Sequence, residues 1–409
     1  CHMKDLTPTG SCRICVVEVK GVPALVPACA YPLREGMDII TNSPRVLLSR
    51  KTVLELIIAN HNGDCLNCVR NGNCELQALS EEYGIRERRF KGEVRPPEVD
   101  ITPFLEKYDD KCILCGRCVR TCNEIQKIGA IGYTKRGFYT KVAPAFDEGI
   151  NVSHCISCGQ CVTVCPVGAL RERSNVKKVA AALNNPELFK VVQYAPSIRV
   201  SIGEEFGLEP GVDMRKKLNT ALKLMGFHKV FDTNFSADLT IVEEANEFIQ
   251  RFTKKNPNPL PMFTSCCPAW VKHAENAYPH LLPHLSSCKS PQQMLGAVVK
   301  SYYAEKYNID PEKIFMVSIM PCTAKKFEYH RPELGFQYPD VDAVITTREM
   351  GRIIKMGGYH LPNLPESDDD QVLGISTGSA DIFGNTGGVM EAALRTAFYN
   401  LTGQLMSNL

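Results

Sequence analysis

The most constraining feature of this sequence is a repeated run of cysteines. The segments CILCGRCVRTC (residues 112–122) and CISCGQCVTVC (residues 155–165) match each other at an interval of 43 residues, and each has the pattern C-x-x-C-x-x-C-x-x-x-C. Three thiolates at such gaps can wrap one cubane, while the fourth reaches the other cluster. The spacing predicts two 4Fe-4S clusters, one held by Cys112, Cys115, Cys118 and Cys165, the other by Cys155, Cys158, Cys161 and Cys122.

Zinc is the alternative ligand for a cysteine-rich segment. Structural zinc sites use paired C-x-x-C knuckles that close around one ion with four ligands. A doubled triplet with a crossing fourth cysteine does not follow that arrangement, and the second run ends in Cys165-Pro166, as it does in bacterial ferredoxins. The repeat therefore favours clusters over zinc.

A third group of ligands lies in HNGDCLNCVRNGNC. It supplies His61, Cys65, Cys68 and Cys74, spaced H-x3-C-x2-C-x5-C. Three cysteines and one histidine are also a common zinc set, so zinc stays open here. Beside two cluster motifs, we expect a His-ligated 4Fe-4S cluster, whose neutral imidazole leaves it less negative and easier to reduce.

A fourth group lies at the start of the chain. Cys1, Cys12, Cys15 and Cys29 are spaced C-x10-C-x2-C-x13-C, which departs from the plant-type C-x4-C-x2-C spacing. Four cysteines in a Gly- and Pro-rich segment still suit a 2Fe-2S cluster, with zinc as the alternative.

The number of cysteines agrees with four ligand sets of four residues each. Of nineteen cysteines, fifteen precede residue 166 and, with one histidine, make four sets of four ligands. The remaining four are Cys266, Cys267, Cys288 and Cys322. A chain this large does not need disulfides for stability, so we expect metal ligation in a reducing compartment and a cytoplasmic location.

Composition excludes two classes of partner. The net charge is only +2 and 44% of the residues are hydrophobic, which gives no electrostatic reason to expect nucleic acid or a membrane surface. No apolar run reaches the roughly 18–20 residues of a transmembrane helix. The opening CHMKDLTPTGSCRIC resembles the middle of a domain, so we expect a preceding segment to be missing.

The second part of the chain alternates strands and helices. We expect strands at 188–195, 229–233, 259–265 and 313–322, helices at 214–227, 239–252 and 291–307, and a strand followed by a helix within 342–357. This alternation predicts parallel sheets covered by helices, with a site at the carboxyl ends of the strands. In the first part, residues 42–61 predict a helix capped by Ser43, with Pro44 in its first turn and His61 at its end.

The remaining cysteines resemble those of a known family. The order of a 2Fe-2S module, a His-plus-three-Cys module and a double 4Fe-4S module resembles both the FeFe-hydrogenases and the large iron–sulfur subunit of respiratory NADH dehydrogenase. In the second part, FTSCCPAW (263–270), IMPCTAKKFE (319–328) and FGNTGGVMEAALRTA (383–397) are similar to motifs of the FeFe-hydrogenase active-site domain. The chain is therefore identified as a member of that family.

The resemblance implies a modular α+β fold of four domains. These are a partial 2Fe-2S ferredoxin-like domain (1–40), a 4Fe-4S domain with one His and three Cys ligands (41–100), a bacterial 2x4Fe-4S ferredoxin domain (101–175), and an α/β hydrogenase H-cluster domain with parallel sheets flanked by helices (176–409), whose C-terminal part is absent.

The resemblance also implies an H-cluster, a 4Fe-4S cubane joined through a cysteine to a diiron subsite that carries CO, cyanide and a bridging dithiolate amine. Cys267 and Cys322 then become cubane ligands. Lys325 is expected to hydrogen-bond a cyanide, where its positive charge suits an anionic ligand. Met320 is expected to pack against the diiron unit, with Ser197 near the other cyanide.

A proton path is implied as well. Cys266 becomes the thiol that faces the bridging amine, and the path continues outward through Glu244, Ser286, Glu247 and Arg251. Glu244 and Glu247 are three residues apart and share a helix face, and a chain of Cys, Glu and Ser can pass protons. Without the resemblance, a solvated Glu-rich face is the simpler interpretation.

One departure from the family pattern concerns the third signature, a C-x3-C in a Gly-rich segment, which this sequence does not contain. Only Cys267 and Cys322 remain as cubane ligands, so we expect either a longer protein or a lost site, and the abrupt start of the chain favours the former. The chain as given is not expected to bind the H-cluster. Cys288 is expected to be a buried structural cysteine.

The expected function is the hydrogenase subunit of a cytoplasmic multi-subunit complex that interconverts H2 with protons and electrons. No G-x-G-x-x-G or P-loop is present, so electrons are expected to pass to a flavin- and NAD-binding subunit, a small 2Fe-2S subunit and ferredoxin, which would allow electron bifurcation. The alternatives are an electron-transfer subunit resembling that of NADH dehydrogenase and a hydrogen sensor.

Overall fold

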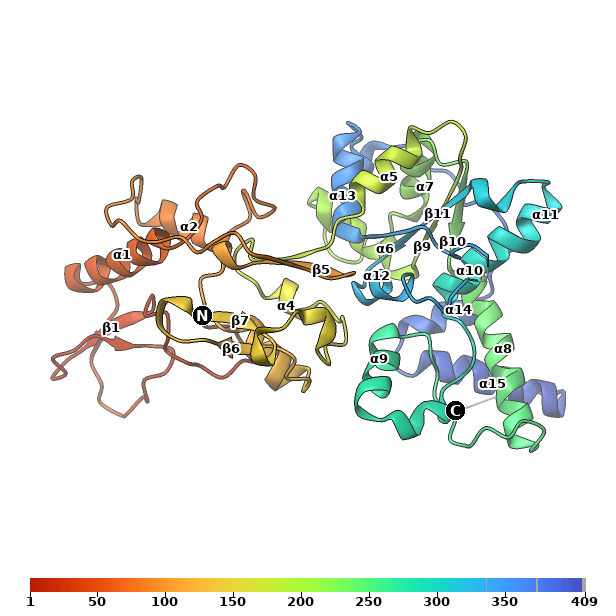
Figure 1. Ribbon diagram of the computed structural model, residues 1–409, viewed down its shortest axis with the longest axis horizontal. Coiled ribbons are helices and arrows are strands. Elements are labelled where there is room, and N and C mark those ends of the chain that lie inside the picture. The colour runs from red at the N-terminus through yellow and green to blue at the C-terminus, as the bar shows by residue number, and fades with distance from the viewer. Residues whose placement is uncertain (336, 373, 407–409) are drawn as a thin grey trace. The chain divides into compact units, whose positions relative to one another are not determined.

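The computed structural model describes residues 1–335, 337–372 and 374–406 (Figure 1). Its contacts divide the chain into two compact units. The first comprises Cys1–Cys155 and Gly159–Arg173, and the second comprises Ile156–Cys158 and the chain from Ser174 onward. Each unit has its own hydrophobic core, so each is described by itself.

The first unit is built from small antiparallel sheets and short helices. Its sheets have the strand orders β2-β1-β3 and β4-β5-β8, and β6 pairs with β7. The strands are β1 (Val16–Val19), β2 (Val26–Pro27), β3 (Ile39–Ile40), β4 (Val99–Ile101), β5 (Leu105–Tyr108), β6 (Gly132–Thr134), β7 (Lys141–Ala143) and β8 (Leu170–Glu172). The helices are α1 (Pro44–Ala59), α2 (Glu75–Glu82), α3 (Arg117–Arg120) and α4 (Gln160–Thr163).

Helix α1 confirms the expectation for residues 42–61. The Ser43 hydroxyl accepts a hydrogen bond from the Val46 amide at 3.2 Å, which satisfies one of the free donors of the first turn. Proline at the next position suits the helix start. Val46, Leu54 and Ala59 are buried, and the helix ends one residue before Asn60, which places His61 just beyond it.

The second unit contains a four-stranded parallel sheet with the order β10-β9-β11-β12. Its strands are β9 (Phe189–Tyr194), β10 (Lys229–Asp232), β11 (Ile314–Met320) and β12 (Ala343–Thr346). Nearly every residue of these strands is buried, as expected for a parallel sheet covered on both faces. The carboxyl ends of all four strands meet at one edge, which is where a site is expected.

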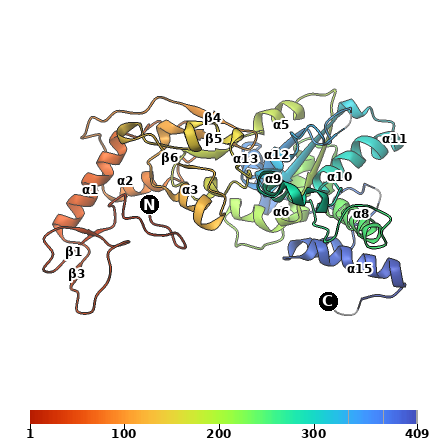
Figure 2. The same ribbon diagram turned by 60° about the horizontal axis from the view of Figure 1, so that its bottom comes forward.

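Helices cover this sheet. In Figure 1, α5, α7 and α13 lie together to one side of it. Helix α8 packs along α10 and α15 (Figure 2). The helices of this unit are α5 (Val176–Leu183), α6 (Pro196–Ser201), α7 (Arg215–Leu224), α8 (Asn234–Phe252), α9 (Pro268–Ala277), α10 (Pro291–Val298), α11 (Ala304–Lys306), α12 (Ala324–Glu328), α13 (Thr347–Met356), α14 (Gly378–Asp381) and α15 (Gly388–Thr402).

The expected mixed α/β fold with a parallel sheet is confirmed, with three local differences. The strand expected at 259–265 is wrong, because this segment makes only an isolated bridge between Phe263 and Leu285. Its two prolines, Pro259 and Pro261, lack the amide hydrogens that a strand ladder needs. The helix expected at 291–307 is interrupted by a π turn at 299–303, and α8 begins five residues earlier than expected, at Asn234.

A fully buried ion pair joins α12 to α13. The Lys326 ammonium lies 2.7 Å from Glu349 Oε2, and neither side chain is exposed. The same ammonium donates to the Val344 carbonyl at 2.6 Å. Glu349 also accepts from the Thr346 and Asn175 amides, at 2.7 and 3.0 Å. One carboxylate therefore holds α12, the end of β12 and the segment before α5 together.

In the described part of the chain, no helix combines the length and the apolar character needed to cross a bilayer.

We expect Glu349→Gln to lower the free energy of unfolding of the second unit by about 3 kcal/mol, because it leaves the Lys326 charge buried without its counter-ion. Urea unfolding followed by circular dichroism measures the change. The control is Asp368→Asn, which removes an ion pair to Lys216 with exposed side chains and should cost less than about 0.5 kcal/mol. Equal losses in the two variants would contradict the assigned role of Glu349.

Candidate functional site

The two cysteine runs adopt the same backbone conformation. Leu114 and Ser157, at equivalent positions, have φ of 54° and 62°, and the glycines two residues later, Gly116 and Gly159, have φ of 71° and 73°. Glycine is favoured at such angles because it lacks a Cβ. Each run bends through two left-handed residues and then enters a short helix, α3 or α4. The bend turns successive backbone amides toward one side, a geometry suited to an anionic cluster.

Within the first unit, Cys165 from the second run lies with the cysteines of the first run. Burial raises the pKa of Cys118 well above its usual range, with further contributions from the thiols of Cys112, Cys161, Cys115 and Cys165. Burial likewise raises the pKa of Cys112 to about 11, and the Cys165 thiol adds to the shift. Cys118 and Cys165 are both buried. The structure thus brings together the four thiols predicted to share one cluster.

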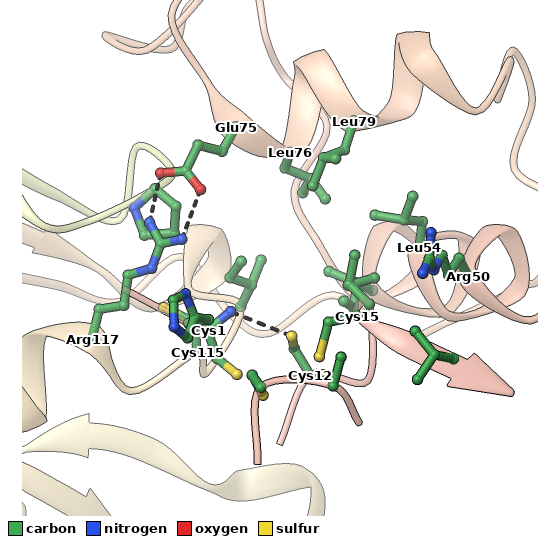
Figure 3. Close-up of a pocket in the computed structure, with 18 of the residues that line it drawn as sticks. Cys1, Cys12, Cys15, Arg50, Leu54, Glu75, Leu76, Leu79, Cys115 and Arg117 are labelled. Atoms are coloured by element: carbon green, nitrogen blue, oxygen red, sulfur yellow. Dashed lines mark hydrogen bonds and ion pairs between the residues drawn. The ribbon is translucent and has the colours of Figure 1, made fainter. Parts of the chain in front are cut away.

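The four N-terminal cysteines line one side of a cavity of about 500 Å³ in the first unit (Figure 3). The Cys1 amine donates to Cys12 Sγ at 3.3 Å, and burial together with the nearby Cys15 thiol raises the pKa of Cys29. Cys115 lines the same cavity. These contacts place the predicted 2Fe-2S ligands next to a cysteine of the predicted 4Fe-4S set.

The cavity is closed on another side by an ion pair. Arg117 donates to both carboxylate oxygens of Glu75, at 2.5 and 2.8 Å, and Figure 3 shows this pair above Cys115. A bidentate pair of this kind holds both side chains in one geometry. It ties α2 to α3.

The surroundings of His61 favour its neutral imidazole form, which can act as a ligand. Burial lowers its pKa, which favours the uncharged imidazole, and its buried Nδ1 has no hydrogen-bond partner among the described residues. Cys74 and Cys68 lie close enough to Cys65 to add to the rise in its pKa that burial causes. An unpaired ring nitrogen and three grouped thiols are donors of the kind that a cluster with one histidine ligand requires.

Across residues 1–335, 337–372 and 374–406, no group of three or more His, Cys, Asp or Glu side chains is arranged to hold a single metal ion.

In the second unit, two cysteine loops meet beside a lysine. Cys266 and Cys267 precede α9, and Cys322 follows β11. Lys325, one turn into the segment after Cys322, donates from Nζ to the Cys266 carbonyl at 2.9 Å and to Glu328 Oε2 at 3.0 Å. This ammonium therefore joins the two loops.

Burial favours the protonated form of two thiols in this group, Cys266 and Cys322. Burial raises the pKa of Cys266 to about 11, which the Lys325 charge partly offsets and Glu244 increases. Burial also raises the pKa of Cys322, with a smaller increase from the Cys267 thiol. Cys267 itself is exposed. Three thiols, an ammonium and a carboxyl group thus lie near one another. The thiols are potential ligands of an Fe-S cluster, and the carboxyl group is a potential proton carrier beside them.

Two other expected site residues, Met320 and Ser197, differ in their burial. Met320 is buried at the last position of β11, next to the Cys322 loop. Ser197 is exposed in the first turn of α6, and none of the hydrogen bonds found in the described part of the chain joins its side chain to the Cys266 loop.

Gly388 begins α15, where a Cβ would lie 1.8 Å from the Ile382 carbonyl oxygen, so only glycine fits there.

The four residues expected to continue the proton path beyond Cys266 are all buried: Glu244, Ser286, Glu247 and Arg251. Burial raises the pKa of Glu244 to about 7, although the Ser286 hydroxyl and the Ser265 backbone lower it. Burial is the larger influence, because neither Glu244 oxygen has a partner at ordinary hydrogen-bond distance in the described residues. Glu247 lies one turn further along α8. Burial opposes its ionisation, but bonds from Arg251 and Ser287 outweigh burial and hold its pKa below the ordinary value.

Several residues of this region are not expected from the sequence. Ser287 donates from its hydroxyl and its amide to Glu247 Oε2, at 3.0 Å each. Glu328 pairs with Lys325. The Thr323 hydroxyl donates to the Ser157 carbonyl at 2.9 Å. Only the neighbouring motifs LSSCKS and PCTAKKFE point to these residues in the sequence, and neither shows which side chains meet.

Models of four protein families match successive parts of the chain. A 2Fe-2S iron–sulfur cluster binding domain matches residues 1–44, and the NADH-ubiquinone oxidoreductase-G iron–sulfur binding region matches 50–89. The ferredoxin-like domain of NADH-quinone oxidoreductase subunit 3 matches 102–171. The C-terminal domain of the iron-only hydrogenase large subunit matches 189–409, which is more than half of the chain.

Curated relatives agree with these matches. The NADP-reducing hydrogenase subunit HndD of Solidesulfovibrio fructosivorans is 48% identical over 402 residues, covering 97% of this chain and 69% of that protein. Iron hydrogenase 1 of Clostridium pasteurianum is 44% identical, covering 94% of this chain and 67% of that protein. The chain thus spans about two-thirds of each relative.

A solved structure of the FeFe-hydrogenase HydA1 from Chlamydomonas reinhardtii superposes with a TM-score of 0.53 and 47% identity. The superposition covers 58% of this chain and 60% of that chain.

The contrast between the two glutamates gives a pH prediction. Because the folded pKa of Glu244 is raised to about 7, its carboxyl should be protonated below pH 7 and ionised above it. The C=O stretching band of the protonated acid, measured by infrared spectroscopy, should titrate near pH 7 and vanish in Glu244→Gln. Glu247→Gln should keep the band, and its loss there would contradict the assignment.

The same shift affects stability. For a carboxyl with a raised folded pKa, the unfolded state releases its proton first, so the free energy of unfolding falls as the pH rises from about 4.5 to 7. The fall attributable to Glu244 should be about 3 kcal/mol, and Glu244→Gln should lack it.

Proposed function

This chain belongs to the iron-only hydrogenase large-subunit family, and we propose from that premise that it is the hydrogenase subunit of a multi-subunit complex that catalyses the reversible conversion of H2 to protons and electrons. The observation that supports the proposal most strongly is the meeting of Cys266, Cys267 and Cys322 around Lys325, with Glu244 behind them. This arrangement supplies cluster ligands, positive charge and a proton carrier in one place.

In the proposed site, Cys267 and Cys322 would supply two ligands of the H-cluster cubane. When bound, the H-cluster supplies the metal centre at which H2 is formed or split. Lys325 places its ammonium between the two cysteine loops, where anionic ligands of the diiron subsite suit it. Met320 and Ser197 are proposed to line the same subsite.

Cys266 and Glu244 are proposed to carry protons to and from the site. A thiol with a pKa of about 11 stays protonated at neutral pH, so Cys266 can hold a proton beside the metal centre. Glu244, with a pKa of about 7, can both accept and release a proton at neutral pH. Ser286 and Glu247 continue this relay away from the site.

Electrons are proposed to pass through one 2Fe-2S and three 4Fe-4S clusters held by the ligand sets of the first part of the chain. The cavity shared by Cys12, Cys15 and Cys115 supports close approach of two of these clusters. The relative HndD is by name a subunit of an NADP-reducing hydrogenase. By analogy, we propose a flavin- and NAD(P)-binding subunit, a small 2Fe-2S subunit and ferredoxin as partners, with electron bifurcation, in the reducing cytoplasm that free thiols require.

The second candidate is an electron-transfer subunit without chemistry of its own. It is favoured by the matches of residues 50–89 and 102–171 to parts of NADH dehydrogenase. Activity separates the two functions. If the matured, full-length protein neither evolves H2 from a reduced dye nor oxidises it, the hydrogenase proposal fails.

We expect Cys266→Ser to lower H2 evolution at least about a hundredfold, the contribution expected from a positioned proton carrier, while the iron content stays unchanged. Iron analysis and a dye-linked assay measure the two quantities. Cys288→Ser is the control, because this thiol has neither proposed role, and it should change neither. Loss of iron in Cys266→Ser would mean that the roles of Cys266 and Cys267 are reversed.

We expect His61→Cys to lower the reduction potential of one 4Fe-4S cluster, because a thiolate adds a negative charge where the neutral imidazole was. A redox titration followed by electron paramagnetic resonance measures the potential. His360→Gln is the control, since this histidine lies in the second unit, and it should leave every potential unchanged. An unchanged set of potentials in His61→Cys would exclude His61 as a ligand.

A further inference from the structure

Arg251, which the family resemblance places at the outer end of the proton path, is enclosed within the protein. Its side chain is 0% exposed. The guanidinium donates to Glu247 Oε1 and to backbone carbonyls, at 2.5 to 3.2 Å. These carbonyls belong to Pro259, Pro283, His284 and Leu285. A guanidinium stays charged at all ordinary pH values and has no acceptor, so Arg251 is suited to clamp this region rather than to pass protons.

The two oxygens of Glu247 have different partners. Oε1 is bound by Arg251 at 2.5 and 3.1 Å. Oε2 accepts from the Ser286 hydroxyl at 3.1 Å and from the hydroxyl and amide of Ser287 at 3.0 Å each. Oε2 is therefore the only one of the two oxygens with hydroxyl partners among the described residues, and a proton can enter or leave the carboxylate there.

The two hydroxyls on Oε2 face opposite environments. Ser286 is buried, at 5% exposure, and it lies on the side of Glu244, whose pKa it lowers. Ser287, the next residue, is exposed to solvent. One carboxylate oxygen thus connects an inner hydroxyl with an outer one.

We propose that Ser287 is the solvent terminus of the proton relay, so that protons exchange between water and Glu247 Oε2 through the Ser287 hydroxyl. Ser287 then takes the place of Arg251 as the exit of the path. The physiological role of this exit rests on the proposed hydrogenase function. Arg251 then acts as a positioning residue that holds Oε1 and turns Oε2 toward the two serines.

Proton transfer through this group is balanced without any change of electrons. On the inward path, a proton from water binds the Ser287 oxygen as the proton of its own O–H bond passes to Glu247 Oε2. The protonated carboxyl then gives a proton to the Ser286 oxygen, and the Ser286 hydroxyl, which donates to Glu247 Oε2 in the structure, turns toward Glu244 to pass its own proton on. The outward path reverses each step. The Ser287 amide keeps its bond to Oε2 while the hydroxyl rotates.

A matched pair of variants tests the hydroxyl. Threonine and valine have the same shape, so Ser287→Thr keeps the hydroxyl and Ser287→Val replaces it with a methyl group that also keeps a water molecule out of its place. In the full-length holoenzyme, Ser287→Val should lower H2 evolution and oxidation about tenfold or more relative to Ser287→Thr. The KM for the dye and the iron content should be the same in both, because neither depends on a proton exit.

A second measurement does not require turnover. After dilution into D2O at pH 6, where Glu244 is largely protonated, the C=O stretch of this carboxyl shifts as deuterium replaces the proton. The shift should appear more slowly in Ser287→Val than in Ser287→Thr, and a structural defect alone would not separate these variants. Thermal unfolding of both confirms that they fold equally.

The outcomes distinguish the inference from the proposed function. If the wild-type holoenzyme shows no H2 chemistry but the exchange differs between the variants, the proposed function fails and the proton exit stands. If the wild type is active and the variants have equal turnover and equal exchange, Ser287 is not the exit. Slower exchange together with lower turnover in Ser287→Val supports both.

Discussion

The buried ion pair between Lys326 and Glu349 is the interaction on which the candidate site most depends. Glu349 fixes the start of α13 at the end of β12, and Lys326 fixes α12 against it. The neighbouring lysine, Lys325, is thereby directed to the Cys266 carbonyl. A buried pair of this kind contributes little net stability compared with apolar packing, but it is costly to break. Its effect is to hold the Cys322 loop in a single position relative to the Cys266 loop.

The proton-carrying groups show how one helix can give two identical side chains different chemistry. Glu244 and Glu247 are one turn apart on α8. Glu244 has no partner at ordinary hydrogen-bond distance in the described residues, and burial raises its pKa to about 7. Glu247 is held by Arg251 and two serines, and its pKa is lowered. Glu244 is thus suited to hold or release a proton near neutral pH, whereas Glu247 favours the ionised form and connects the hydroxyls of two serines.

Much of the fold could be predicted from the sequence, because it depends on local patterns. The periodicity of residues 188–195, 229–233 and 313–322 predicts strands that the structure contains, and the motifs FTSCCPAW and IMPCTAKKFE predict the family that the comparisons show. The strand at 259–265 could not be excluded by composition alone, since its apolar residues suit a strand while its prolines prevent regular pairing. Ser287 could not be found, because adjacent serines differ only in their burial.

The sequence by itself determined which residues can be cluster ligands, because the three cysteines of a C-x-x-C-x-x-C run lie close enough in one loop to bind the same cubane. It also determined the left-handed bends that Gly116 and Gly159 allow. Only the tertiary structure decided that Cys165 lies with Cys118, that Arg251 is enclosed and that Ser287 is exposed. These facts depend on segments distant in the sequence, whose packing sets the burial, charge and hydrogen bonds of each side chain.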